Sequence, residues 1–63
     1  MTTFKETALS VLSDICRELR ERGAVELTEE DTARLVRATW ASTELGATTE
    51  EVAAALREGW ESE

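Results

Sequence analysis

Apolar residues recur along residues 3–22 at the three- and four-residue spacing of an amphipathic α-helix. Acidic, basic and hydroxyl side chains take the rest of each turn. The predicted inward arc consists of Phe4, Ala8, Val11, Leu12, Ile15 and Leu19, flanked by Leu9 and Cys16. Residues 49–61 repeat the pattern more briefly. Their predicted inward face consists of Val52, Ala55, Leu56 and Trp60. Both segments are therefore predicted to be helices with one buried face.

Residues 29–45 form a third helical segment, but their apolar groups fall on two nearly opposite sides. One side carries Ala33, Val36 and Trp40. The other side carries Leu35, Ala38, Ala41 and Leu45. This pattern predicts either the central helix of the fold or a helix that forms an interface.

Helix boundaries are predicted by threonines at the starts and glycines at the ends. Each threonine precedes an acidic residue by three positions, the spacing of a capping box, in which two side chains satisfy backbone N–H groups reciprocally. The pairs are Thr3 with Glu6, Thr28 with Asp31, and Thr48 with Glu51. Gly23 and Gly46 stand where a left-handed residue would end a helix. The sequence thus predicts an all-α, compact three-helix domain over residues 1–63, with helices at about 3–22, 29–45 and 49–61.

The run from residue 24 to residue 27 is too short to predict a strand. We expect a loop that turns Val25 or Leu27 toward the core.

The chain has 63 residues, so its core is expected to be thin. Small domains usually gain support from disulfides, a metal or oligomerisation. Cys16 is the one cysteine and there is no histidine, which excludes an intramolecular disulfide and a structural zinc site. Oligomerisation is the support that remains. The sequence therefore predicts a homodimer.

Fourteen acidic residues oppose seven basic ones, for a formal net charge of −7. The imbalance is greatest in residues 47–63, where five glutamates accompany Arg57 alone. Such a surface repels phosphate backbones and anionic lipids, so neither nucleic acid nor a membrane is an expected partner. No apolar run is long enough for a signal peptide or a membrane span. Together with the lone cysteine, this predicts a soluble, cytoplasmic protein.

Catalytic chemistry is not expected in this chain. Without histidine, proton transfer near neutral pH would need a carboxylate or lysine displaced in pKa by deep burial. Cys16 has no histidine to activate it and is interpreted as a buried packing residue. The acidic runs at residues 29–31 and 50–51 are explained by the helix macrodipole, and no metal or other cofactor is expected.

A weak resemblance to the helix-turn-helix of small repressors covers about twenty residues of the C-terminal half. It depends on Ser42, Leu45, Gly46 and Val52, residue types that many helix–glycine–helix corners share. The resemblance implies that residues 49–60 form a DNA-recognition helix. The charged residues of this segment are three glutamates and one basic residue, Arg57. Two alternatives therefore stay open: a nucleic-acid-binding regulator, or an acidic nucleic-acid mimic that occupies a basic groove.

The main prediction is a noncatalytic protein–protein interaction module, acting as a regulator, adaptor or inhibitor subunit that binds another protein. Trp40 is expected to be a large packing unit of the core. Trp60 could serve the core or a partner. The residues predicted to contact a partner or a second copy are Leu35, Ala38, Ala41, Leu45 and Trp60.

Overall fold

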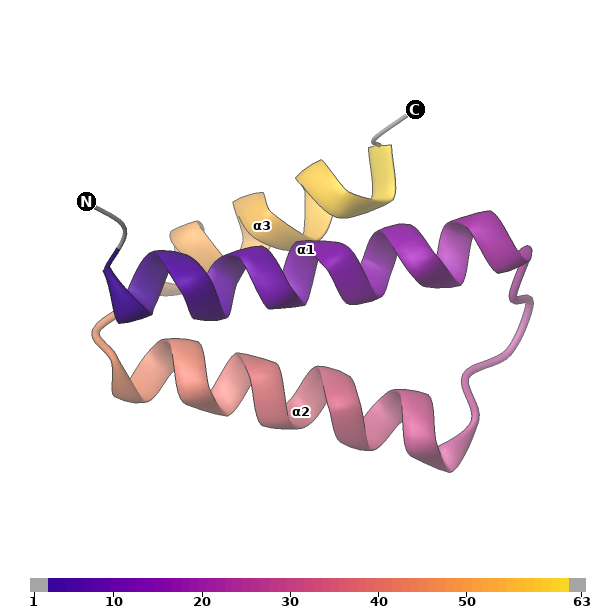
Figure 1. The fold of residues 1–63 in the computed structure, drawn as a ribbon, viewed down its shortest axis with the longest axis horizontal. Coiled ribbons are helices and arrows are strands. Elements are labelled where there is room, and N and C mark those ends of the chain that lie inside the picture. The colour runs from indigo at the N-terminus through magenta and orange to yellow at the C-terminus, as the bar shows by residue number, and fades with distance from the viewer. Residues whose placement is uncertain (1–2, 62–63) are drawn as a thin grey trace.

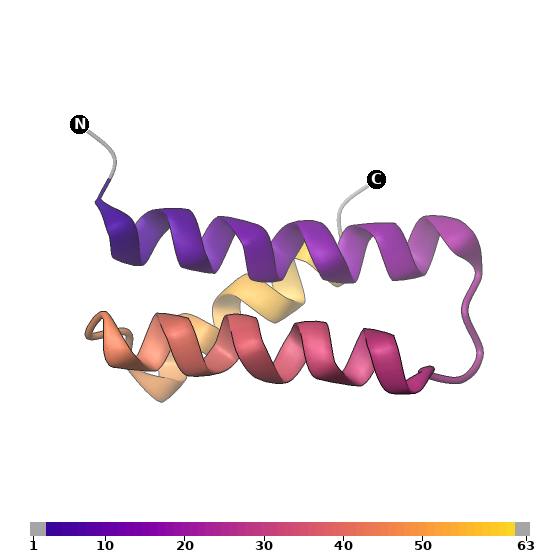
Figure 2. The ribbon, with the colours of Figure 1, turned by 60° about the horizontal axis from the view of Figure 1, so that its bottom comes forward.

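The computed structural model describes residues 3–61, which form three α-helices. Helix α1 spans Phe4–Arg22, α2 spans Glu29–Glu44 and α3 spans Thr49–Glu61. Helices α1 and α2 run antiparallel, and α3 runs obliquely behind them, from the end of α2 toward α1 (Figures 1 and 2). The fold is therefore the predicted all-α three-helix domain, with helix bounds within one residue of those predicted.

All three predicted capping boxes are present. In each box the hydroxyl of the cap threonine accepts a hydrogen bond of 3.1 Å from a backbone N–H group three residues later. The donors are Glu6, Asp31 and Glu51. The acidic side chains return the contact by accepting from the cap N–H groups at 3.1 to 3.3 Å. Because these bonds satisfy amides that have no partner inside a helix, they fix where each helix begins.

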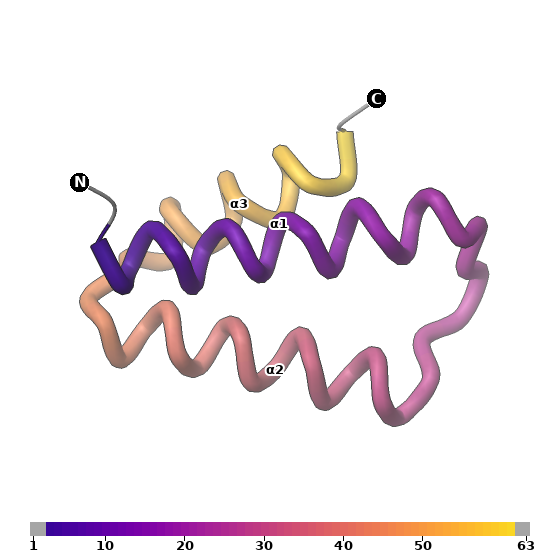
Figure 3. Tube along the Cα trace, viewed as in Figure 1, coloured from indigo at the N-terminus to yellow at the C-terminus, as the bar shows by residue number. Residues whose placement is uncertain are grey.

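The two predicted glycine ends are also confirmed. Gly23 has a φ of 69° and Gly46 a φ of 97°, both in the left-handed region that side chains disfavour. The next residues, Ala24 and Ala47, donate their N–H groups back to the carbonyls of Leu19 and Ser42 at 3.1 and 2.9 Å. This is the Schellman arrangement. It ends both α1 and α2, and each helix is followed by a connection of different length (Figure 3).

The core is built along one stripe of α1. Leu12, Ile15 and Leu19 are buried there, and Ala38 of α2 and Ala55 of α3 pack against them. Helix α1 contacts both other helices extensively, whereas α2 and α3 contact each other least. Burying a leucine or isoleucine stabilises a fold by about 2 kcal/mol. Most of that stabilisation therefore comes from α1 as the central helix.

The backbones of α1 and α3 come close together where the two helices cross. The buried Ser13 hydroxyl donates to the Ala55 carbonyl over 2.7 Å. Gly59, one turn further along α3, lies so near Ser13 that a β-carbon at this position would overlap the Ser13 carbonyl oxygen. A glycine is therefore required here by space, within a helix whose backbone conformation any residue could adopt.

Two ion pairs join α1 to α2. Arg22 donates to Asp31 at a distance of 2.6 Å, and Arg34 donates to Glu18 at a distance of 2.8 Å. The side-chain hydrogen bond from Arg34 lowers the pKa of Glu18, and the same pair raises the pKa of Arg34. These contacts hold the start of α2 against the end of α1.

Three predictions about burial are wrong. Phe4 and Val11 do not belong to the inward arc of α1, because they are 81% and 47% exposed. In the connection between α1 and α2, Ala24 packs against the core, while Val25 and Leu27 face solvent. Trp40, predicted as a core residue, is 69% exposed. The physical reason for the Trp40 error lies in how α2 meets α1.

Candidate protein-interaction surface

Helix α2 turns its smallest residues inward. Ala38 and Ser42 are buried against the rest of the fold, and the Ser42 hydroxyl donates to the Ala38 carbonyl over 2.8 Å. Small side chains let α2 lie close to the core that α1 already fills. A residue two positions away points to the opposite side of a helix, at about 200°. Val36 and Trp40 are each two positions from Ala38, so they face outward, with 58% and 69% of their surface exposed.

An open groove of about 600 Å³ lies between α2 and α3. We call it the α2–α3 groove. Its residues are Leu35, Val36, Thr39, Trp40, Thr43, Glu44 and Leu56. Leu35 and Leu56 pack against the core on one side, so the groove reaches down to the hydrophobic interior. Val36 and Trp40 extend its apolar lining onto the exposed side of α2.

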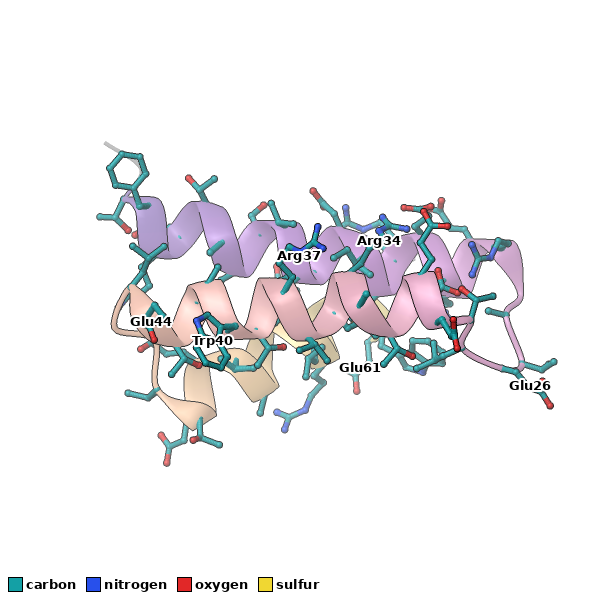
Figure 4. All side chains as sticks on the ribbon, turned by 90° about the horizontal axis from the view of Figure 1, so that it is seen from below. Glu26, Arg34, Arg37, Trp40, Glu44 and Glu61 are labelled. Carbon is teal, nitrogen blue, oxygen red and sulfur yellow. The ribbon has the colours of Figure 1, made fainter. Side chains whose placement is uncertain are left out.

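Two charged residues accompany Trp40 on α2. Arg37 and Glu44 lie before and after Trp40 along the helix (Figure 4). They are seven positions apart, which is nearly two full turns, so they share one side of the helix. We call Val36, Arg37, Trp40, Thr43 and Glu44 together the outer face of α2.

Arg37 also differs from most other basic residues in having no partner among residues 3–61. Five of the seven basic residues form an ion pair or hydrogen bond within the chain. These are Lys5, Arg17, Arg20, Arg22 and Arg34. Within the described part of the chain, Arg37 and Arg57 form neither kind of contact, nor does Glu44. The outer face of α2 therefore carries two opposite charges that are available for a partner.

The structure separates the residues that the sequence predicted as an interface. Ala38 is in the core, and Leu35 packs against the core below the α2–α3 groove. Ala41 is half-buried in a shallow hollow between α1 and α2. Leu45 follows the last turn of α2 and is 45% exposed. Whether these residues contact a partner stays a prediction, but they do not form one continuous open surface.

Trp60 lies at the opposite end of the molecule from the turn between α2 and α3. It is 52% exposed and lines a hollow of about 310 Å³ with Cys16, Leu35 and the loop that follows α1. Cys16 itself is buried, as the sequence predicted, and desolvation raises the pKa of its thiol. Burial and a raised pKa both keep this thiol in its unreactive, protonated form.

The sequence alone does not predict the outer face of α2, because the small residues of this helix also fit a contact with a second chain. In the structure these residues are where α2 approaches its own core. One available signal was the abundance of leucine and isoleucine on α1. A helix that already supplies the bulk of a thin core needs small neighbours, which leaves a large residue such as Trp40 on the outside.

The described residues give little support for a metal site, a membrane-spanning helix or a nucleic-acid-binding surface. Among residues 3–61, no three His, Cys, Asp or Glu side chains are grouped as a metal site would need. No helix in this same part of the chain has the length and apolar character needed to cross a membrane. Three glutamates on the exposed side of α3, Glu50, Glu58 and Glu61, accompany Arg57.

Comparison of the chain with protein-family models, with curated proteins and with solved structures found no match.

Proposed function

We propose that this chain is a noncatalytic protein-interaction module that binds another protein through the outer face of α2 and the adjoining α2–α3 groove. One observation carries the proposal: Trp40 is 69% exposed beside an apolar groove that reaches the core. A tryptophan left in water is costly, because covering such a side chain removes about 150–250 Å² of surface from solvent. Tryptophans are also enriched among the residues that dominate binding energy. Homodimerisation, which the sequence also predicts, is one form of this binding.

The test compares two variants that each remove one exposed apolar side chain. Trp40→Ser alters the proposed surface, and Val25→Ser is the matched control, because Val25 is 96% exposed and lies in the loop before α2. Proteins retained from an extract of the source organism by the immobilised chain are purified, and their affinity for each variant is measured by calorimetry. We expect Trp40→Ser to weaken binding about tenfold or more, the effect of losing a central contact.

Two results would overturn this proposal. One is that the wild type stays monomeric and retains no other protein more strongly than Trp40→Ser does. The other is that Val25→Ser weakens binding as much as Trp40→Ser does.

The helix-turn-helix alternative gains no support from the exposed side of α3, where glutamates outnumber Arg57. A recognition helix normally presents Arg, Lys, Asn or Gln to base edges. We expect no duplex DNA binding tighter than about 10⁻⁶ M at physiological salt, the strong end of ordinary nonspecific affinity. An electrophoretic shift at low and physiological salt checks this, and a tighter, sequence-specific complex would favour the nucleic-acid alternative.

A further inference from the structure

We infer that the outer face of α2 pairs with the same face of a second copy, with the two helices antiparallel about a two-fold axis near residues 40 and 41. This inference rests on the proposed function, because it names one partner for the same surface. Two-fold dimers are the commonest closed assemblies, and each subunit contributes the same patch to such an interface.

The order of residues along α2 makes this face complementary to itself. In an antiparallel pair centred between residues 40 and 41, the numbers of residues that face each other add to about 81. Arg37 of one chain then meets Glu44 of the other, and the symmetry repeats the contact. Because Arg37 and Glu44 lie on one side of the helix, both contacts form along the same edge of the pair.

The apolar residues fit the same register. The two Trp40 side chains meet close to the axis. Val36 and Thr43 of the facing helix lie beside them, on the side of the groove. Pairing would cover the largest exposed apolar side chain of α2 at the centre of the contact. It would also pair Arg37 and Glu44, which have no partner among residues 3–61. Apolar contact at the centre with charges at the edge is the usual organisation of a specific interface.

The interface is small, because it uses one face of a single helix. It falls below the standard contact of about 800 Å² per partner, so weak association is expected. Each chain also carries a net charge of −7, and the repulsion between copies opposes assembly. Sedimentation equilibrium over about 5 to 500 µM spans the dissociation constants expected of such a contact.

Charge exchange provides the test. Arg37→Glu and Glu44→Arg each place like charges opposite one another twice, so we expect each to weaken dimerisation about fivefold or more. The double variant restores opposite charges and should return the dissociation constant to within about twofold of the wild type. Trp40→Ser should abolish the dimer in this range. All three residues changed in these variants are solvent-exposed, and helical circular dichroism of each variant verifies that the fold is retained.

Glu44→Arg is the most informative single change, because it reduces the net charge of each chain from −7 to −5. General repulsion alone predicts that this variant dimerises more strongly, whereas the proposed register predicts that it dimerises more weakly. A monomer at all concentrations, a dimer strengthened by Glu44→Arg, or a dimer that ignores both single changes would each overturn the inference. A monomer that still captures a different protein through Trp40 would overturn the dimer and leave the proposed function intact.

Discussion

Helix α3 meets its two neighbours in opposite ways. At the α1–α3 crossing, Ser13, Ala55 and Gly59 bring the backbones close enough for a side chain to bond directly to a helix carbonyl. On the side of α2, the same helix leaves an open groove. The difference follows from side-chain size, because small residues line the crossing whereas Trp40 and Leu56 stand at the groove. In a chain this short, tight packing on one side of a helix leaves too few residues to close the other side, and that side becomes available for binding.

The largest expected effect comes from filling the α1–α3 crossing. Gly59→Ala should lower the free energy of unfolding by about 2 kcal/mol, because a buried overlap with backbone must be relieved by moving a helix. Urea unfolding followed by circular dichroism measures the change. Ala53→Gly, on the exposed side of the same helix, is the control and should cost only about 1 kcal/mol through helix propensity. If Gly59→Ala instead stabilises the protein, as glycine-to-alanine changes do in exposed helices, the close crossing is wrong.

A smaller effect is expected at the corner that positions α3 beside the groove. Thr48→Ala removes the hydroxyl that accepts from the Glu51 N–H, and should cost about 1 kcal/mol of unfolding free energy. Thr49→Ala is the matched control, because this threonine is exposed and lies within the first turn of α3 without a capping bond. Equal losses in the two variants would show that α3 does not begin at the Thr48 cap.

Acid should weaken the attachment of α2 to α1. Burial of Asp31 acts to raise its pKa, but hydrogen bonds from Arg22 and from the Thr28 backbone and hydroxyl outweigh burial and leave the pKa below its ordinary value. A carboxylate with a depressed pKa contributes stability that is present above its unfolded pKa of about 4 and is lost as pH falls through the folded value. The melting temperature should therefore fall as the pH is lowered below about 4.

Asp31→Asn tests whether Asp31 causes the acid sensitivity, since the asparagine side chain cannot titrate. The variant should melt below the wild type at neutral pH, and its melting temperature should fall less steeply in acid. Identical slopes for the two proteins would place the acid sensitivity elsewhere, with Glu18 and Glu51 as the other carboxylates of lowered pKa.

The smallest effect is expected at the open side of α2. Trp40→Ser, measured at concentrations where the chain is monomeric, should change the free energy of unfolding by less than about 0.5 kcal/mol, as exposed substitutions usually do. Val25→Ser should behave in the same way. A loss as large as that of Gly59→Ala would mean that Trp40 belongs to the core and that the groove is closed in solution.

The parts of this fold that could be predicted from sequence are those determined by neighbouring residues. Thr28 and Asp31 are three positions apart and form their cap without help from the rest of the chain, and Gly23 ends α1 through its own backbone conformation. The side of α2 that is buried depends on long-range packing. Ala38 and Trp40 are both apolar, and only the amount of space left by Leu12, Ile15 and Leu19 decides which of them faces the core.

The bond from Ser13 to Ala55 joins residues that are 42 positions apart in the chain. During synthesis, α1 and α2 emerge before the residues that complete this crossing. The buried stripe of α1 then lacks the cover supplied by Ala55 and Gly59 until nearly the whole domain has been translated. Closing so long a segment is a late and entropically costly step, and apolar surface left open in the meantime favours aggregation. The close contact between α1 and α3 thus determines when the nascent chain is most vulnerable.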